Sequence, residues 1–403
     1  MSLLSRLLFQ VVFFLSGFLA IPSLLGHESP RIEFIGTASI PGDASDLSGD
    51  AALLENGEPR NRLGGFSALD FSGKGNIYAA LSDRGPDDGA VGYPCRVQLL
   101  EIRIESESAL PVSVKVIRTT LLTDSQSRQF TGSSAAIEAT KKLSHRLDPE
   151  GFRFAQDGGM FVSDEYGPVL IHFGADGREH RRFKVPEHFL VKNPHADKKK
   201  ENQNNHVGRA SNRGMECLAV SHDGRYLVGL MQSSLLQDSN RTEDGMVLGR
   251  NCRLVQIDIN SGDTREFVYQ MDSTDNGNSE LLAYGPDEYI VLERDSHAGK
   301  DARYRKLIHI NLEGATDVAR EKRLPADDLS QNITPVSRHV LLDLLEEQWG
   351  LAGESMPEKI EGLTFGPVLA DGRRTLLVGT DNDFELANAS LIWVFAVTPV
   401  LPE

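Results

Sequence analysis

The sequence predicts an all-β fold, a β-propeller built from four-stranded blades. One hairpin pattern recurs five times along the 403 residues, every copy is followed by a third strand, and several copies are followed by a fourth. Repetition of one four-stranded unit is typical of propellers, in which the first strand of each blade lines a central channel. The repeats indicate five blades and leave open a sixth, degenerate blade in residues 119–145 or 325–358.

Residues 1–26 are typical of a secretory signal. Arg6 supplies a positive charge, an apolar run follows as far as Ile21, and small residues then offer cleavage sites. An uncleaved membrane anchor is the alternative, although the run is short for a full span. We expect a secreted or periplasmic protein whose propeller domain occupies residues 31–400. Residues 31–36 alternate as a strand, which we expect to complete the last blade and to close the ring by pairing the chain ends.

The clearest hairpin lies in residues 147–168. Residues 151–155 and 160–163 flank Asp157-Gly158-Gly159, a strong turn signal. Because a hairpin returns the chain to its starting point, Glu150 should lie beside Asp164 and Glu165. Three carboxylates repel one another, so a cation should neutralise them. The alternative is a pair of acidic turns in water.

The other four hairpins lie in residues 65–85, 215–232, 279–295 and 360–383. Four of the five copies have Glu at the matching start, and four have an acid at the matching end. Met231-Gln232 stands where the other copies hold an acid. Since the first strand of a blade lines the channel and the second returns to the same face, these acids should converge around one mouth. The predicted metal ligands of this ring are Asp83, Glu150, Asp164, Glu216, Glu280, Glu293, Glu361 and Asp381.

Four segments between the hairpins carry further predictions. Residues 83–88 form a charged turn that either contacts a metal or a phosphate, with Arg84 as the bidentate donor, or is an ion-paired turn. Residues 186–212 are the longest irregular stretch and are predicted to be a mobile surface loop, the alternative being a lid over the channel. Residues 135–141 suggest one helical turn, and residues 338–349 suggest a short amphipathic helix.

Composition excludes several classes of function. Asp and Glu outnumber Lys and Arg by 58 to 42, for a net charge of −16, which argues against nucleic acid or an anionic membrane as partner. No membrane contact is expected beyond a retained signal anchor, and we expect a monomer. Cys95, Cys217 and Cys252 lack metal-ligand spacing, and they fit either one disulfide with a free thiol or three buried thiols. The sequence contains no P-loop, dinucleotide fingerprint or Gly-x-Ser-x-Gly motif.

Residues 64–397 resemble the phytase-like family, whose members are described by an esterase-like activity of phytase. The motifs that carry the resemblance are Ser82-Asp83-Arg84-Gly85, Asp148-Pro149-Glu150-Gly151, Val162-Ser163-Asp164-Glu165-Tyr166-Gly167, Leu292-Glu293-Arg294, Ile360-Glu361-Gly362-Leu363, the Asp371 to Leu377 run and Asp381-Asn382-Asp383-Phe384. The resemblance implies a propeller, export, and an active site made of Glu and Asp side chains that acts on phosphate esters.

Two hypotheses for the acidic ring follow. In the first, it holds one or more Ca²⁺ ions, because all its members are hard oxygen ligands. Glu150, Asp164, Glu165 and Glu361 are then the predicted catalytic residues, and Arg84 and Arg294 bind the phosphate of a small phosphorylated substrate that is hydrolysed by a metal-activated water. In the second, the ring holds a structural cation or a ligand, and the protein is a non-enzymatic extracytoplasmic binding propeller.

Overall fold

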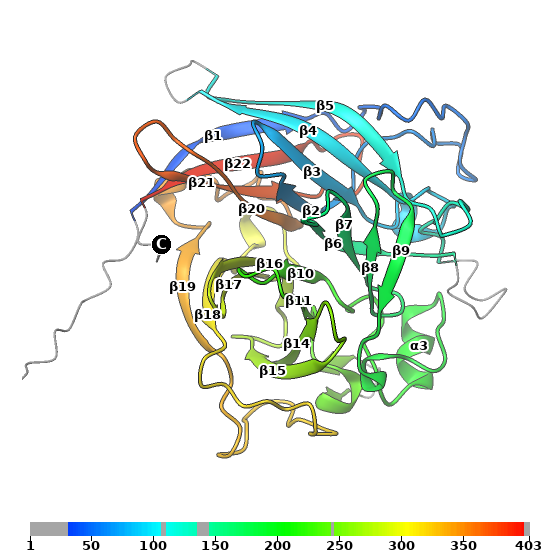
Figure 1. Cartoon of the computed structure of the whole chain (residues 1–403), viewed down its shortest axis with the longest axis vertical. Helices are drawn as coiled ribbons and strands as arrows, with labels where there is room; N and C mark the ends of the chain where they lie inside the picture. The colour runs from blue at the N-terminus through cyan, green and yellow to red at the C-terminus, as the bar shows by residue number, and fades with distance from the viewer. Residues whose placement is uncertain (1–30, 106–109, 135–144, 243–245, 399–403) are drawn as a thin grey trace, which may run out of the picture.

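The computed structural model describes residues 31–105, 110–134, 145–242 and 246–398. The predicted signal in residues 1–26 and the predicted helical turn at residues 135–141 lie outside the described residues. Five antiparallel sheets of four strands surround one axis, which confirms the β-propeller (Figure 1). The innermost strands β2, β6, β10, β16 and β20 contact one another in turn all the way round, so the ring is closed.

Blades 1 to 4 are meanders whose strands follow the order of the sequence from the channel outward. Blade 1 contains β2 (Phe66–Phe71), β3 (Ile77–Ser82), β4 (Arg96–Ile104) and β5 (Val112–Leu121). Blade 2 contains β6 (Pro149–Phe154), β7 (Met160–Asp164), β8 (Val169–Phe173) and β9 (Glu179–Phe183). Blade 3 contains β10 (Cys217–Val220), β11 (Tyr226–Leu230), β14 (Asn251–Asp258) and β15 (Thr264–Gln270). Blade 4 contains β16 (Gly277–Gly285), β17 (Glu288–Arg294), β18 (Arg305–Asn311) and β19 (Ser337–Asp343).

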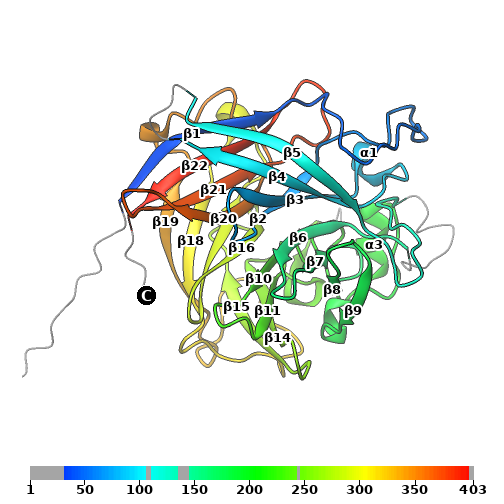
Figure 2. The same ribbon diagram turned by 45° about the horizontal axis from the view of Figure 1, so that its top comes forward.

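Blade 5 joins the two ends of the described chain, as predicted. It consists of β20 (Ile360–Val368), β21 (Arg374–Thr380), β22 (Ser390–Val397) and, as its outermost strand, β1 (Ile32–Ile40). Strands β1 and β22 pair antiparallel from Ile32 opposite Val397 to Ile40 opposite Ser390, and both views show them side by side (Figures 1 and 2). This pairing covers the edge that β22 would otherwise expose.

Among the described residues there is no sixth blade. Residues 119–121 end β5, and residues 337–343 form β19, so both candidate stretches contribute to the five blades already counted. The one further sheet in the described part of the chain is the two-stranded pair β12 (Asn240–Arg241) and β13 (Val247–Leu248).

The prediction of a helix over residues 338–349 is wrong. The segment forms strand β19, which pairs with β18, and then a 3₁₀ turn, η4 (Glu347–Trp349). Val340 is exposed, whereas Leu342, Leu344 and Trp349 are buried between blades 4 and 5. Apolar residues at this spacing fit both a helical and an alternating period over so short a run, and the free edge of β18 selects the strand.

The remaining helices are short. They are α1 (Pro86–Gly89), η1 (Glu187–Phe189), α3 (Lys198–Asn204), η2 (Leu236–Asp238) and η3 (Gly299–Asp301). In the described residues no helix has the length and apolar character needed to cross a membrane. The three cysteines are buried free thiols.

Residues 186–212 are a folded segment rather than an irregular loop. Asp197 caps α3 by accepting the Lys200 N–H at 3.1 Å. Glu201 in α3 forms a buried ion pair with Arg209 at 2.9 Å, and Arg209 also donates to the carbonyl of Tyr166 in blade 2 at 2.8 Å. These contacts fix the segment against the mouth of the propeller.

Candidate functional site

One mouth of the channel holds a polar pocket of about 170 Å³ that all five blades help to line. Six carboxylates line it: Asp83, Glu150, Glu165, Glu216, Glu358 and Glu361. Four cationic side chains also line it: Arg84, Arg213, Arg294 and Lys359. The excess of acids makes the pocket a candidate site for a cation, and its arginines and lysine are donors that an anion could use.

Most of the predicted site residues meet in this pocket. The structure brings together Asp83, Arg84, Glu150, Glu165, Glu216, Arg294 and Glu361, and Asp381 lies next to Asp83. They come from the starts of the first strands and the ends of the second strands, which a propeller blade places on one face.

Bulges in the first strands set which residue enters the pocket. In blades 2 and 5 the register shifts after the residue opposite the last residue of the second strand, and in blade 4 it shifts one residue later, after Asn278 opposite Glu293. The residues at the shift include Glu150, Ser279 and Glu361, and a bulged residue is released from the regular alternation of side chains. In blade 4 this position therefore belongs to Ser279 and not to the predicted Glu280.

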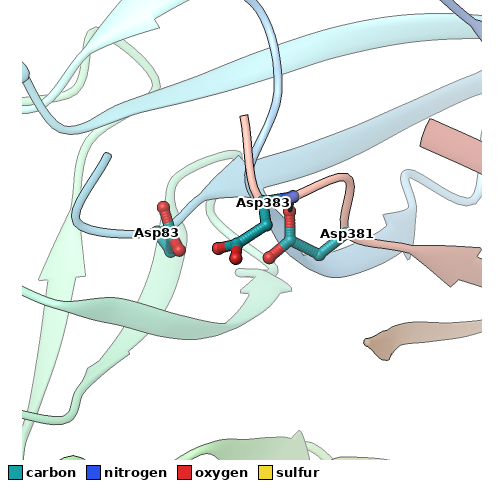
Figure 3. A group of neighbouring side chains, drawn as sticks. All are labelled: Asp83, Asp381 and Asp383. Atoms are coloured by element: carbon teal, nitrogen blue, oxygen red, sulfur yellow. Dashed lines mark hydrogen bonds between the residues drawn. The ribbon is translucent and has the colours of Figure 1, made fainter. Parts of the chain in front are cut away.

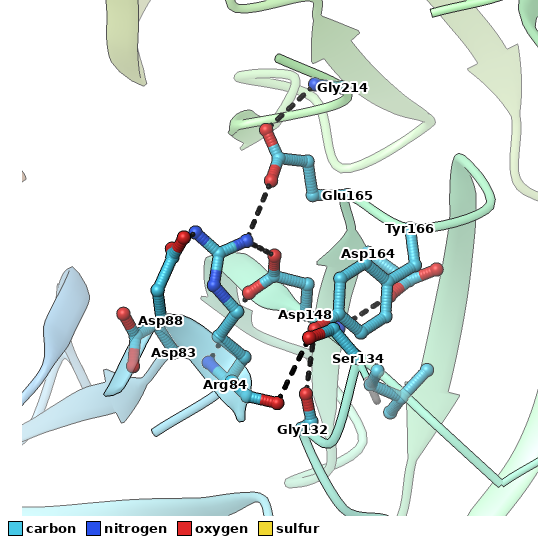
Figure 4. A network of polar contacts seen from close by, with 12 residues as sticks. Asp83, Arg84, Asp88, Gly132, Ser134, Asp148, Asp164, Glu165, Tyr166 and Gly214 are labelled. Atoms are coloured by element: carbon cyan, nitrogen blue, oxygen red, sulfur yellow. Dashed lines mark hydrogen bonds and ion pairs between the residues drawn. The ribbon is translucent and has the colours of Figure 1, made fainter. Parts of the chain in front are cut away.

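A buried group of three carboxylates from blade 2 lies at the pocket, which Glu150 and Glu165 line. Oxygen atoms of Asp148, Glu150 and Glu165 lie within 4.8 Å of one another. Arg84 forms an ion pair with Asp148 and a longer one with Glu165 at 3.4 Å, as Figure 4 shows. Glu165 also accepts the Gly214 N–H at 2.8 Å. Burial, with the charge of Asp148, raises the pKa of Glu165 to about 8.

Glu150 differs from its neighbours because it has no protein partner. Its side chain is only 7% exposed, yet among the described residues no hydrogen bond or ion pair reaches its carboxylate. Burial first, and then the charges of Glu216, Asp148 and Glu165, raise its pKa well above the usual value. A buried carboxylate without a partner is costly, so this group either takes up a proton or binds a cation.

The opposite wall of the pocket is formed by blades 3, 4 and 5. Arg294 donates to Glu361 at 2.6 Å and to the Ser279 hydroxyl at 2.9 Å. Gln232, the residue that departs from the acidic pattern, donates its amide to Glu216 at 2.9 Å. Burial and the charges of Glu165 and Glu361 nevertheless raise the pKa of Glu216 well above its usual value.

A second acidic group borders the pocket between blades 1 and 5. Oxygen atoms of Asp83, Asp381 and Asp383 lie within 4.8 Å of one another, and Figure 3 shows the three side chains converging. Lys359, directly before β20, donates to Asp381 at 3.0 Å and to Asp383 at 2.6 Å. Burial and then Asp381 raise the pKa of Asp83 well above its usual value, against the opposing effect of Lys359.

The comparisons with known proteins agree with this architecture. Residues 61–384 match the sequence profile of the phytase-like family, which is described by an esterase-like activity of phytase. The chain belongs to this family. An uncharacterized secreted protein of Arthroderma benhamiae is 24% identical over 351 residues, which cover 68% of this chain and 65% of that protein. The match thus spans less than two thirds of that relative's length.

Solved structures overlap with this phytase-like chain only loosely. The major allergen Mala s 1 of Malassezia sympodialis has a TM-score of 0.39 at 8% identity, covering 86% of this chain and 80% of the allergen. The α-L-arabinofuranosidase of Lactobacillus brevis has a TM-score of 0.39 at 10% identity, covering 82% of this chain and 91% of the enzyme. Overlap at this level supports no inference about activity.

Four of the predicted site residues of this phytase-like chain do not line the pocket: Asp381, which lies beside Asp83 at its border, and Asp164, Glu280 and Glu293. Asp164 accepts the N–H groups of Asp148 at 2.8 Å and Gly167 at 3.0 Å, and burial raises its pKa to about 7. Glu293 accepts from Asn276 at 2.6 Å and from Arg338 at 3.0 Å. Asp164 and Glu293 occupy the same register position, one residue before the side chains of Glu165 and Arg294 that do line the pocket.

Glu280 lies deeper in the channel than the pocket. It forms a buried ion pair at 3.1 Å with Arg153 of blade 2. The same guanidinium donates to the carbonyls of Leu281 in blade 4 at 2.5 Å, Leu69 in blade 1 at 3.4 Å and Leu363 in blade 5 at 3.5 Å. Arg153 therefore ties blade 2 to three other blades below the pocket.

Sequence reasoning assigned no role to several groups at the site. Asp148 had a signal, because it stands in the same Asp-Pro-Glu-Gly motif as Glu150. Lys359 had a weaker sequence signal: it lies two residues before Glu361 and therefore on the same face of an extended chain. Asn212 and Arg213 come from the segment that follows α3, where no sequence pattern points to the pocket.

Proposed function

We propose that this phytase-like protein is an exported, metal-dependent phosphoric-ester hydrolase that acts in the acidic pocket. The observation that carries the proposal is the unpartnered, buried carboxylate of Glu150 beside Asp148 and Glu165. Such a group gains most from a divalent cation. Arginines at the rim of the same pocket supply donors for a phosphate group, so cation and anion sites adjoin.

Asp148, Glu150 and Glu165 are the residues that would hold the ion, with Glu216 as a further oxygen donor on the opposite wall. Three carboxylates with no nitrogen or sulfur ligand suit a hard cation such as Ca²⁺. When bound, the ion would supply charge stabilisation for a phosphoryl group and would lower the pKa of a water.

Other residues of the pocket would bind the substrate and position the carboxylates. Arg294, held by Glu361 and Ser279, and Arg213 are placed to bind phosphate oxygens of a small substrate. Arg84 fixes Asp148 and Glu165. Of the predicted catalytic residues, Glu150 and Glu165 are thus assigned to the ion, and Glu361 lines the pocket and positions Arg294. Asp164 lies outside the pocket and would support the site by accepting the Asp148 N–H.

We infer export from two observations. Residues 1–26 have the pattern of a secretory signal, and the relative from Arthroderma benhamiae is named a secreted protein. The net charge of −16 favours a small substrate that is met at the pocket over nucleic acid. We expect the protein to act as a monomer.

The proposal is tested by assaying purified protein with p-nitrophenyl phosphate, bis-p-nitrophenyl phosphate and phytate, in Ca²⁺ and in chelator. We expect calcium-dependent turnover that is lost in Glu150→Gln and in Glu361→Gln, while circular dichroism shows the native fold. Glu313→Gln, an exposed residue far from the pocket in the β18–β19 connection, is the matched control and should retain full activity. Turnover that survives chelator and both pocket substitutions would overturn the proposal.

A second candidate function is a non-enzymatic extracytoplasmic binding propeller with a structural cation. It is favoured by the pairing of Arg84 and Arg294 with carboxylates, which leaves fewer free donors for a phosphate group. This candidate predicts calcium binding without turnover of any ester, and calcium binding that still depends on Glu150.

A further inference from the structure

The second acidic group of the pocket has the composition of a cation site. Asp83, Asp381 and Asp383 each offer a carboxylate oxygen within 4.8 Å of the others, as the first group does (Figure 3). Backbone hydrogen bonds fix the carboxylates of Asp83 and Asp381. Asp83 accepts the Gly85 N–H at 2.8 Å, Asp381 accepts the Asp383 N–H at 2.7 Å, and the Asp381 N–H donates to the Lys359 carbonyl at 3.2 Å.

Each group has one cation of the chain on two of its three carboxylates. The Lys359 ammonium donates to Asp381 at 3.0 Å and to Asp383 at 2.6 Å, and Arg84 pairs with Asp148 and Glu165. The two groups differ at the third carboxylate. Asp83 accepts the Gly85 N–H at 2.8 Å, whereas among the described residues no hydrogen bond or ion pair reaches Glu150, so the first group is the one open to an ion.

We propose that the Lys359 ammonium is a built-in cation of the second acidic group, so that the pocket takes one divalent ion, at Asp148, Glu150 and Glu165, rather than two. This rests on the proposed function for that one ion. The ammonium donates to two of the three carboxylates and offsets part of their negative charge, and because it is covalently attached it cannot dissociate. Lys359 then keeps one positive charge beside the second group at every calcium concentration.

The electrostatic surroundings of Lys359 support this role. The carboxylates of Asp381, Glu361, Asp83 and Asp383 surround the ammonium, and Asp381 and Asp383 accept its hydrogen bonds. The Lys359 side chain also lines the pocket, so the donor not used by Asp381 and Asp383 is available to an anionic group there.

The test counts bound calcium by equilibrium dialysis at saturating Ca²⁺. Wild type and Lys359→Arg, which keeps the charge, should each bind one ion, and Lys359→Met should bind two. Asp83→Asn in the wild-type background should leave the number of bound Ca²⁺ ions at one, because the second acidic group, which it disrupts, holds no ion. This second variant decides the question even when Lys359→Met fails to fold.

Two results would overturn the inference. One is a second ion already bound to wild type and lost in Asp83→Asn. The other is folded Lys359→Met that binds no more calcium than wild type. If wild type binds no calcium and Lys359→Met binds one ion, the ion of the proposed function is refuted while the role of Lys359 is supported.

Discussion

Replacing Arg153 with Met should strongly destabilise the propeller. The substitution keeps much of the side-chain volume but leaves Glu280, which is fully buried, without its cation. It also removes the donor that reaches the carbonyls of Leu281, Leu69 and Leu363 from three other blades. Breaking a buried ion pair from one side costs about 3–5 kcal/mol of unfolding free energy.

The assay is urea unfolding followed by the fluorescence of the two tryptophans, which lie between blades 4 and 5. With an m-value of about 3 kcal/mol per M, a loss of about 4 kcal/mol lowers the midpoint by ~1.3 M. Arg320→Met, at an exposed position, is the control and should shift the free energy by less than about 0.5 kcal/mol.

The double variant Arg153→Met/Glu280→Met separates pairing from packing. Because it removes both buried charges, it should be more stable than Arg153→Met alone. A single variant as stable as the surface control, or a double variant whose loss is the sum of the two single losses, would refute the interpretation of Arg153 and Glu280 as a coupled pair.

Three further predictions concern other parts of the molecule. In chelator, thermal stability should fall from pH 6 to pH 9. The reason is that Glu165, whose pKa is about 8 in the folded protein against an ordinary value of 4.5, holds a proton that the unfolded chain has lost. Glu165→Gln should flatten this decline, and a rise of stability with pH would contradict the assignment. A chain that starts at Pro41 lacks β1 and should form aggregates that light scattering detects, whereas a chain that starts at Arg31 should remain monodisperse. A soluble monomer of the shorter chain would refute closure of the ring by β1. Glu201→Gln breaks the buried pair with Arg209 and should make residues 190–213 the first site of proteolysis, and an unchanged digestion pattern would show that this pair does not hold the segment.

The architecture could be predicted from the sequence because its signals are local and repeated. Turns such as Asp157-Gly158-Gly159 and Asp371-Gly372 mark hairpins, and a third strand follows each one. The strand β19 was missed because seven residues of ambiguous period, Ser337–Asp343, take their conformation from β18, a partner supplied by the tertiary fold.

The site could be predicted to within one residue in each strand. Sequence reasoning placed Glu280 and Glu293 in the pocket, but Glu280 follows the bulge at Ser279 and pairs with Arg153, and the residue after Glu293, Arg294, lines the pocket instead. A shift of one residue reverses the direction of a side chain, and a bulge has no reliable signature in a single sequence. Lys359 was missed because a lone lysine beside acids has no pattern of its own.

The most direct test of the central claim is calcium titration by isothermal calorimetry of wild type, Glu150→Gln and Glu280→Gln. The structure predicts that wild type binds Ca²⁺, that Glu150→Gln loses binding, and that folded Glu280→Gln binds as wild type does. Calcium binding that is unchanged in Glu150→Gln, or absent from wild type, would contradict the claim that the blades assemble their acids into a cation site.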